Sequence, residues 1–514
     1  MKRLKKLLRQ KGKKLPDLKS VIKKAGLLAC FFLFQIISFA APTNTWRFDA
    51  ESDALYRMVI NLRTEEAIAK LQRINHKENL YYRFYIQSLA ECIEILITED
   101  ESKFPKVEAN FKQRLNYLEA EKESAETLFL RAELSLQRGF CYLNMNQSFN
   151  AILSIRQAYN LTESCLKKYP DFLPVRKTSG VLQVMLGTIP DKYHWFLSLL
   201  GMEGSVKKGQ SQLNELRQAN VSLSVEASVL YYTIKGLINQ QFTEAARGLT
   251  EILKKEPDNR LLMFIAINMY IKNEQSEDAL QLIKRLDKKT DGLPLVYLEY
   301  LRAEILLQKG EYNASISSYQ LFMKTYKGSS FRKDATLKIG LAYHMLNKPQ
   351  LAKVWWDKAK STGKEVAEPD VLAASMISEG SFPNEKLFRI KLLTEGGYFK
   401  EARSILSNLT ISSFSNLKDQ TEFLYRKARF FQVTNDLRSA SGLYLKVIEI
   451  SSNNPWYFGA ASCLQLGIIY KNANEFVLSK KYFERVLSYR KHAYKDNFDI
   501  KAKAALAELE KIKS

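Results

Sequence analysis

The stretch "IGLAYHMLNKPQLAKVWWDKAK", residues 339–360, contains the pattern that decides the fold. Counting from Gly340, Tyr343 lies three residues on, Ala352 twelve, Trp356 sixteen and Ala359 nineteen. This spacing predicts two antiparallel helices that approach closely where small residues face the partner helix, with a large aromatic ring filling the gap to the next pair. The tryptophans and small residues of this stretch are therefore predicted to be packing residues, with no catalytic role.

The same arrangement of small and aromatic residues returns along the chain. Further units start at Gly139, Ile267, Ala428 and Gly467, and the small residue of the second helix recurs at Ala151, Ala245, Ala279, Ser315, Ala352, Ala402, Ala440 and Ser479. The pattern resembles the tetratricopeptide repeat, a helix–turn–helix unit of about 34 residues. The resemblance covers most of residues 47–513 and implies an all-α fold, a right-handed superhelical solenoid of antiparallel helix pairs.

Two segments interrupt the repeat and define the expected domains. Between Ala151 and Ala245 the chain is too long for one repeat, and between Ala352 and Ala402 it carries an insertion that holds Pro369, Gly380 and Pro383. The expected parts are a signal segment 1–40, irregular helical repeats 41–220 with an apolar insertion near 187–204, a regular array 221–362, a hinge or insertion 363–386, and a C-terminal array 387–514.

The first interruption is broken by Pro190, Gly201 and Gly204. Residues 179–216 predict a helix to Leu186, a turn, a short helix over 191–200 and a helix from Ser205. The segment is loosely similar to one in tetratricopeptide proteins related to the eukaryotic inclusion-body-clearance and outer-mitochondrial-membrane proteins, which implies an interaction role. Either the short helix fills the superhelix, or it forms an apolar lid or interface patch of Tyr193, Trp195, Phe196, Leu199 and Leu200.

The N-terminus predicts export. Residues 1–24 carry eleven Lys/Arg and one acid, Asp17, and so supply +10 of the formal net charge of +23. An apolar run over 25–40 follows, which predicts a secretory signal cleaved after Ala40 and a periplasmic or cell-envelope location. An uncleaved membrane anchor and a lipidated Cys30 are the alternatives. Export permits disulfides, and Cys141 with Cys165 is the candidate pair, but buried unpaired thiols are the favoured interpretation.

The sequence indicates no catalytic chemistry. Four histidines, His76, His194, His344 and His492, lie far apart and lack metal-ligand spacing. No zinc-protease, nucleophile-elbow or phosphate-loop motif is present. We therefore expect no enzyme, no metal and no cofactor. The basic runs do not indicate nucleic-acid binding in an exported chain.

These patterns favour a scaffold that binds a protein or peptide in a concave groove lined by first-helix residues. By position within the repeat, the groove candidates are Tyr300, Glu304, Gln308, Leu341, His344, Met345, Tyr425, Arg429 and Gln432. The alternatives are an envelope assembly factor that docks on an anionic membrane or envelope complex through a basic surface and residues 191–200, and an enzyme carried on a helical-repeat scaffold.

Overall fold

A computed structural model describes residues 46–74, 79–189, 193–365, 367–452, 454–490, 492 and 494–510. Within these residues it contains α-helices, short 3₁₀ segments and no strand, so the predicted all-α class is confirmed. The signal segment, with Cys30 and Ala40, lies outside the described residues, as do His76 and Pro190.

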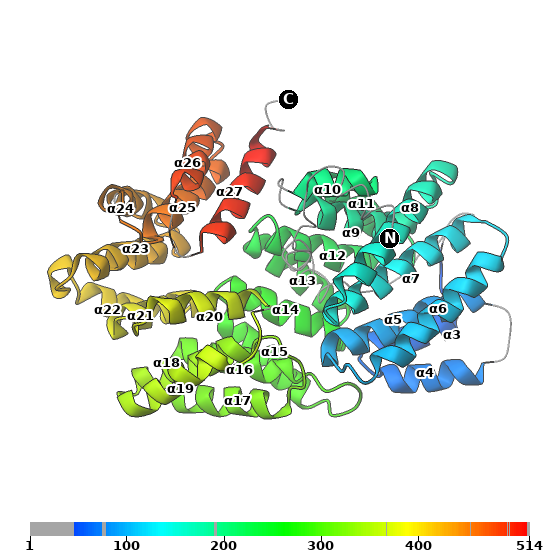
Figure 1. The fold of residues 1–514 in the computed structure, drawn as a ribbon, viewed down its shortest axis with the longest axis horizontal. Coiled ribbons are helices and arrows are strands. Elements are labelled where there is room, and N and C mark those ends of the chain that lie inside the picture. Colours follow the sequence, from blue (N-terminus) through cyan, green and yellow to red (C-terminus); the bar gives the residue numbers. More distant parts are fainter. Residues whose placement is uncertain are drawn as a thin grey trace, which may run out of the picture. The chain divides into compact units, whose positions relative to one another are not determined.

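The chain forms two compact units, each described by itself. Unit 1 contains the described residues up to Met269 with Leu282–Val296 and Tyr326–Gly328, and unit 2 contains Tyr270–Gln281, Tyr297–Thr325 and the described residues from Ser329 on. Helices α14 (Arg260–Lys272) and α15 (Ser276–Asp287) contribute to both units. The other helices belong to one unit each and can be followed by colour in Figure 1.

The helices of unit 1 are α3 (Ala50–Ile60), α4 (Thr64–Arg73), α5 (Leu80–Thr98), α6 (Phe104–Ala120), α7 (Ala125–Asn144), α8 (Ser148–Lys168), α9 (Val175–Gly187), α10 (His194–Leu200), α11 (Val206–Gln218), α12 (Ser224–Leu237) and α13 (Phe242–Lys255). Those of unit 2 are α16 (Tyr297–Lys309), α17 (Tyr312–Thr325), α18 (Arg332–Met345), α19 (Pro349–Ser361), α20 (Glu368–Glu379), α21 (Glu385–Gly396), α22 (Phe399–Ser407), η2 (Ile411–Ser413), α23 (Leu417–Val433), α24 (Leu437–Ile450), α25 (Phe458–Asn472), α26 (Phe476–Ser488) and α27 (Lys495–Glu510).

Several helices begin where a polar side chain can satisfy free backbone N–H groups. Ser124 caps α7 by accepting from the N–H of Thr127, whose side chain accepts in turn from the N–H of Ser124. Asn416 caps α23 by accepting from the N–H of Asp419. Such caps stabilise a helix by about 1 kcal/mol each and fix where it starts.

In unit 1, α7 packs on α8, α9 on α11, and α12 on α13. The α9–α11 pair meets through two glycines, because a Cβ placed on Gly209 would lie 2.4 Å from the carbonyl oxygen of Gly180. The predicted order of helices in this segment is confirmed, with Ser205 capping α11. The first interruption of the repeat is therefore a complete helix pair with α10 inserted between its two members.

The inserted helix α10 has one buried face. Phe196 and Leu200 are buried, whereas Tyr193, Trp195 and Leu199 are partly exposed. The Arg156 Nε donates to the carbonyl oxygen of Leu200 at 3.0 Å, which ties the end of α10 to α8. The buried face fits the filling role that the sequence allows, and binding by the partly exposed residues stays a prediction.

In unit 2, the opening stretch forms the α18–α19 pair. Ala352, Trp356 and Ala359 are buried, and a Cβ on Gly340 would lie 3.2 Å from the carbonyl oxygen of Ala352. Their predicted packing role is confirmed, while Tyr343 is partly exposed.

The insertion 363–386 holds helix α20, which packs on α18 and α19. Phe382 stacks on the ring of His344 with centroids 4.7 Å apart and contacts Trp356 at 4.5 Å. Beyond it, α21 packs on α16, where the Arg389 guanidinium donates to the carbonyl oxygens of Gln308 and Lys309. The insertion thus returns the chain from the α18–α19 pair to α16. Its action as a hinge stays a prediction.

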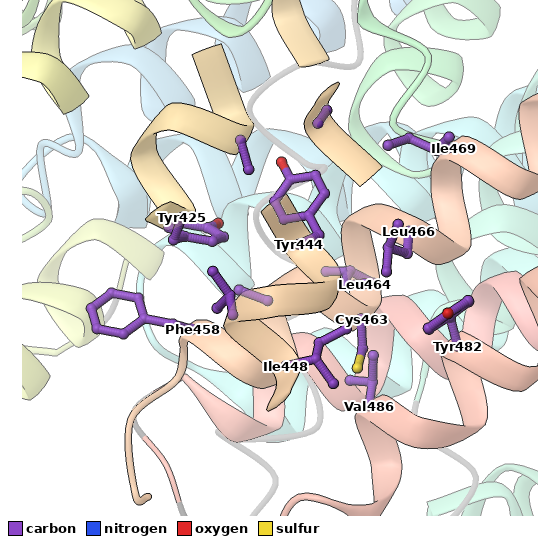
Figure 2. Packing of buried hydrophobic residues seen from close by; sticks show 14 of the residues in the cluster. Tyr425, Tyr444, Ile448, Phe458, Cys463, Leu464, Leu466, Ile469, Tyr482 and Val486 are labelled. Atoms are coloured by element: carbon purple, nitrogen blue, oxygen red, sulfur yellow. The ribbon is translucent and has the colours of Figure 1, made fainter. Parts of the chain in front are cut away.

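The C-terminal part of unit 2 has its own apolar core, drawn in Figure 2. Tyr425 from α23, Tyr444 and Ile448 from α24, Cys463 from α25 and Val486 from α26 meet there. Cys92, Cys141, Cys165 and Cys463 are free and buried, so Cys141 and Cys165 are unpaired in this structure. Among the described residues we find no helix with the length and apolarity needed to cross a membrane.

Candidate partner-binding face of unit 2

The predicted groove residues divide into two groups. Tyr300 and Tyr425 are 3% and 7% exposed, and Gln308 and Leu341 are also buried. The expectation that these four side chains line an open groove is therefore wrong, because each turns onto neighbouring helices. Partly exposed side chains remain at Glu304, His344, Met345, Arg429 and Gln432.

Around Tyr300 lies a charged network shared by α16, α17 and α18. The Tyr300 hydroxyl donates to Asp334 at 2.6 Å. Lys338 forms ion pairs with Asp334 at 2.8 Å and with Glu304 at 2.7 Å. Burial alone would lower the pKa of Lys338, but the two carboxylates outweigh it and raise the pKa above its usual range. Glu304 is therefore held by Lys338 and by the Tyr319 hydroxyl.

Helix α20 adds a carboxylate to this region. Asp370 accepts from the backbone N–H of Phe331 at 2.7 Å and of Asp334 at 3.1 Å, and so caps the start of α18. Burial raises the pKa of Asp370 to about 6, against the effect of these N–H groups. Burial also raises the pKa of Asp334, with Lys338 opposing. The insertion therefore stabilises the start of α18, the helix that carries the predicted groove residues Leu341, His344 and Met345.

A second polar network lies on α23 and α25. The Arg429 guanidinium donates to the side-chain carbonyl oxygens of Gln432 at 2.9 Å and Gln465 at 3.0 Å. Gln432 donates to Gln465 at 3.0 Å and accepts from the Tyr444 hydroxyl at 2.5 Å. The Arg429 side chain keeps 26% of its surface exposed. A partly exposed guanidinium is therefore held in one orientation by several partners.

The loop between α14 and α15 supplies a carboxylate to Arg429. Glu274 lies 3.9 Å from the guanidinium, and both residues belong to unit 2. Burial raises the pKa of Glu274 to about 7; Arg429 opposes this rise and Glu395 adds to it. Because burial disfavours the charged carboxylate more than Arg429 favours it, the protonation of Glu274 changes near neutral pH.

One turn before Arg429, the side chain of Tyr425 is buried among other aromatic rings. Tyr425 contacts the rings of Tyr444, Tyr457 and Phe458 with centroids 5.7–6.2 Å apart. Arg426 is paired with Glu422 at 2.6 Å and donates to the hydroxyl of Tyr457 at 3.0 Å. Arg429, Gln432 and Gln465 are thus the part of this face with both polar groups and exposed surface, and we call them the Arg429 cluster.

Helix α27 brings a further cation near the Arg429 cluster. Burial lowers the pKa of Lys501; Glu368 opposes this change, whereas Lys272 and Arg429 add to it. Asn497 of the same helix donates to Glu368 on α20. The inner region of unit 2 therefore combines cations and carboxylates from α14, α20, α23 and α27.

Sequence reasoning missed a buried ionic network in unit 1. Lys177 lies 2.7 Å from Glu133 and 2.8 Å from Glu226, and it donates to the Tyr85 hydroxyl at 2.6 Å. The Tyr56 hydroxyl donates to Glu226 at 2.7 Å. All five side chains are buried, so they connect α3, α5, α7, α9 and α12 and offer no surface to a partner. Tyr56 and Glu226, the two ends of this network in the sequence, are 170 positions apart, and no local motif indicates such a contact.

Within the described part of the chain, no cluster of three His, Cys, Asp or Glu side chains could hold a metal ion. The Nε2–H of His344 donates to the carbonyl oxygen of Pro383 at 3.0 Å, and the Nε2–H of His194 donates to that of Ile189 at 2.9 Å. These two histidines have structural contacts.

Antiparallel helix pairs with small residues at their contacts, and a polar face on the inner helices, define a tetratricopeptide-like helical-repeat protein. No family model matches the chain, and no curated protein does. Solved structures similar to it include the apo quorum sensor NprR from B. thuringiensis, at 12% identity over 85% of this chain and 97% of that chain with a TM-score of 0.27.

Two further solved structures are similar. The APC/C hetero-tetramer Cut9-Hcn1 is 10% identical over 90% of this chain and 96% of that chain, with a TM-score of 0.25. Aspartyl phosphate phosphatase F from Bacillus subtilis is 14% identical over 82% of this chain and 97% of that chain, with a TM-score of 0.22. TM-scores of this size carry no functional assignment.

Proposed function

We propose that the chain is a non-enzymatic scaffold that binds a protein or peptide partner at the Arg429 cluster of unit 2. The supporting observation is the guanidinium of Arg429, which is partly exposed yet held by Gln432 and Gln465. A side chain that is already ordered loses less entropy when a partner binds. Arginine is also among the residues that most often dominate interface energies.

We infer that this binding takes place outside the cytoplasm, in the periplasm or cell envelope. The support is the basic run over 1–24 followed by the apolar run over 25–40. N-terminal sequencing of the exported protein should start at Ala41. An intact Met1 would instead indicate an anchor, and a lipid-modified start at Cys30 a lipoprotein.

The experiment is affinity capture from the native cell envelope with quantitative mass spectrometry. Arg429→Ala with Gln432→Ala should leave the helical circular dichroism unchanged and weaken capture of the main partner about 30-fold, because truncating an interface arginine typically costs about 2 kcal/mol. The matched control is Arg438→Ala with Lys446→Ala, which removes exposed charges of the outer helix α24. Tyr425 is left unchanged because it is buried.

A second candidate function has its own support. Tyr193, Trp195 and Leu199 of the α10 region are partly exposed apolar side chains in unit 1. They favour an envelope assembly factor that docks through residues 191–200. Trp195→Ala would then abolish capture while the Arg429 double variant has no effect. Turnover of a substrate by the purified protein would contradict both scaffold proposals.

A further inference from the structure

The outer side of α19 carries apolar side chains that no neighbouring helix covers. Leu351 is 43% exposed and Val354 is 61% exposed, and Trp355 is partly exposed. Positions three and four residues apart lie on one side of a helix, so these three side chains form a single stripe. The opposite side of α19, with Ala352 and Trp356, is buried against α18.

The segment that carries this stripe has an excess of positive charge. Residues 348–364 contain five lysines and one aspartate, a net charge of +4. The aspartate, Asp357, accepts from both Lys353 and Lys360 at 2.6 Å, so its charge is compensated locally. The Nζ of Lys358 lies 4.3 Å from the centroid of the Trp355 ring. Lys353 and Lys360 lie about 180–200° round the helix from Leu351, so they do not border the stripe. We call Leu351, Val354, Trp355 and Lys358, with Lys348 and Lys364 at the two ends of the helix, the α19 face.

Two other helices of unit 2 carry exposed apolar residues with mixed charge around them. Val477 on α26 is 74% exposed, but Glu475 and Glu484 accompany the basic residues of that helix. On α24, Leu437 and Leu445 are exposed with Asp436 and Glu449 nearby in the sequence. The α19 face therefore combines an apolar stripe with an excess of one charge in a way that these helices do not.

We infer that the α19 face docks on an anionic lipid surface. Lysine stems extend along apolar surface and place their ammonium groups among lipid phosphates, while aliphatic and tryptophan side chains enter the headgroup region beneath them. Each lysine near an anionic membrane surface strengthens binding about fivefold. A lipid surface is fluid, so it receives a convex helix side without needing a shaped pocket. An acidic protein partner is the competing occupant.

The test uses the full chain with vesicles whose acyl chains carry bromine, which quenches tryptophan fluorescence on contact. Residues 1–45 contain no tryptophan, so insertion of that segment produces no direct signal. Vesicles of phosphatidylcholine with 30% phosphatidylglycerol, about a third anionic lipid, approximate an anionic membrane. We expect quenching that is largely lost in Trp355→Phe and retained in Trp195→Phe, and we expect added salt to weaken it.

Binding is measured by vesicle sedimentation on the same variants. Leu351→Ser with Val354→Ser, and separately Lys348→Gln with Lys364→Gln, should each weaken vesicle binding about tenfold or more. The matched control is Val477→Ser with Leu478→Ser on α26, which removes equally exposed apolar groups. Circular dichroism checks that all variants keep their helices.

Three outcomes would overturn the inference. Equal quenching in wild type and Trp355→Phe would mean that α19 does not touch lipid. An equal loss of binding in the α26 control would mean that the α19 face has no special role. Absence of quenching, together with salt-sensitive binding of polyglutamate that the lysine variants lose, would assign the face to an acidic polypeptide.

Discussion

Asp370 shows how one side chain links a segment that interrupts the repeat to the helix pair before it. Phe331, which precedes α18, has a φ of 63°, a left-handed conformation that costs free energy for a residue other than glycine. The Asp370 carboxylate accepts from the N–H groups of Phe331 and Asp334 and so stabilises this helix start. The carboxylate is buried where it accepts these bonds, and burial raises its pKa to about 6.

This raised pKa predicts a pH-dependent stability. The folded protein binds the Asp370 proton more tightly than the unfolded chain, whose pKa is near the ordinary 3.8. The free energy of unfolding should therefore fall as pH rises from about 4 to about 6, by at most about 3 kcal/mol from this group. Asp370→Asn keeps an accepting oxygen but does not titrate, so this part of the slope should vanish. Urea unfolding at several pH values measures it, and parallel curves for the two proteins would show that Asp370 does not contribute.

At the scale of elements, the pair α9–α11 depends on backbone contact between two helices. Gly180 and Gly209 allow this approach, since a Cβ on Gly209 would lie 2.4 Å from a carbonyl oxygen and 2.7 Å from the Val184 side chain. Backbone cannot move aside as a flexible side chain can. The small residues at helix contacts that mark the repeat in the sequence have the same physical role here.

Gly209→Ala should destabilise the protein by about 1–3 kcal/mol, because overpacking exceeds the gain in helix propensity. The control is Gly442→Ala in α24, where the added Cβ would meet nothing within 4 Å. There the change should stabilise by about 0.5–1 kcal/mol, since glycine inside a helix is unfavourable. Thermal unfolding compares the two, and a stabilising Gly209→Ala would show that α9 and α11 are less closely packed.

At the scale of the molecule, the buried network of Lys177, Glu133 and Glu226 links helices that lie far apart in the sequence of unit 1. Burial alone would lower the pKa of Lys177, but the two carboxylates raise it. Burial raises the pKa of Glu226 against the effect of Lys177. Lys177 is the cation that pairs with both carboxylates, so its removal leaves Glu133 and Glu226 buried without this positive charge.

Lys177→Met should therefore destabilise unit 1 by about 3–5 kcal/mol, the range for breaking a buried ion pair from one side. Hydrogen exchange with mass spectrometry should show faster exchange in α3, α5, α7, α9 and α12 than in α23–α26. The matched control is Lys235→Met in α12, whose ion pair with Glu244 is partly exposed and contributes far less. Uniform acceleration along the chain would mean that the network does not define a separate cooperative region.

Part of the candidate face could be predicted from sequence and part could not. The repeat register places Tyr425 and Arg429 one turn apart on the same helix, and both were expected in the groove. Tyr425 instead packs among Tyr444, Tyr457 and Phe458, whereas Arg429 stays partly exposed and reaches Gln465 and Glu274. The register of one helix does not reveal how the next helix covers it, so exposure depends on the neighbours.

The sequence by itself determined the all-α class, the helix pairs and the order α9, α10, α11, because these follow from the spacing of small and aromatic residues and from local caps. Only the tertiary structure decided that α21 packs on α16, that Asp370 caps α18, and that the network around Lys177 joins five helices. Those contacts join residues tens to hundreds of positions apart. Their geometry depends on the accumulated angles between many helix pairs, and no local pattern contains that information.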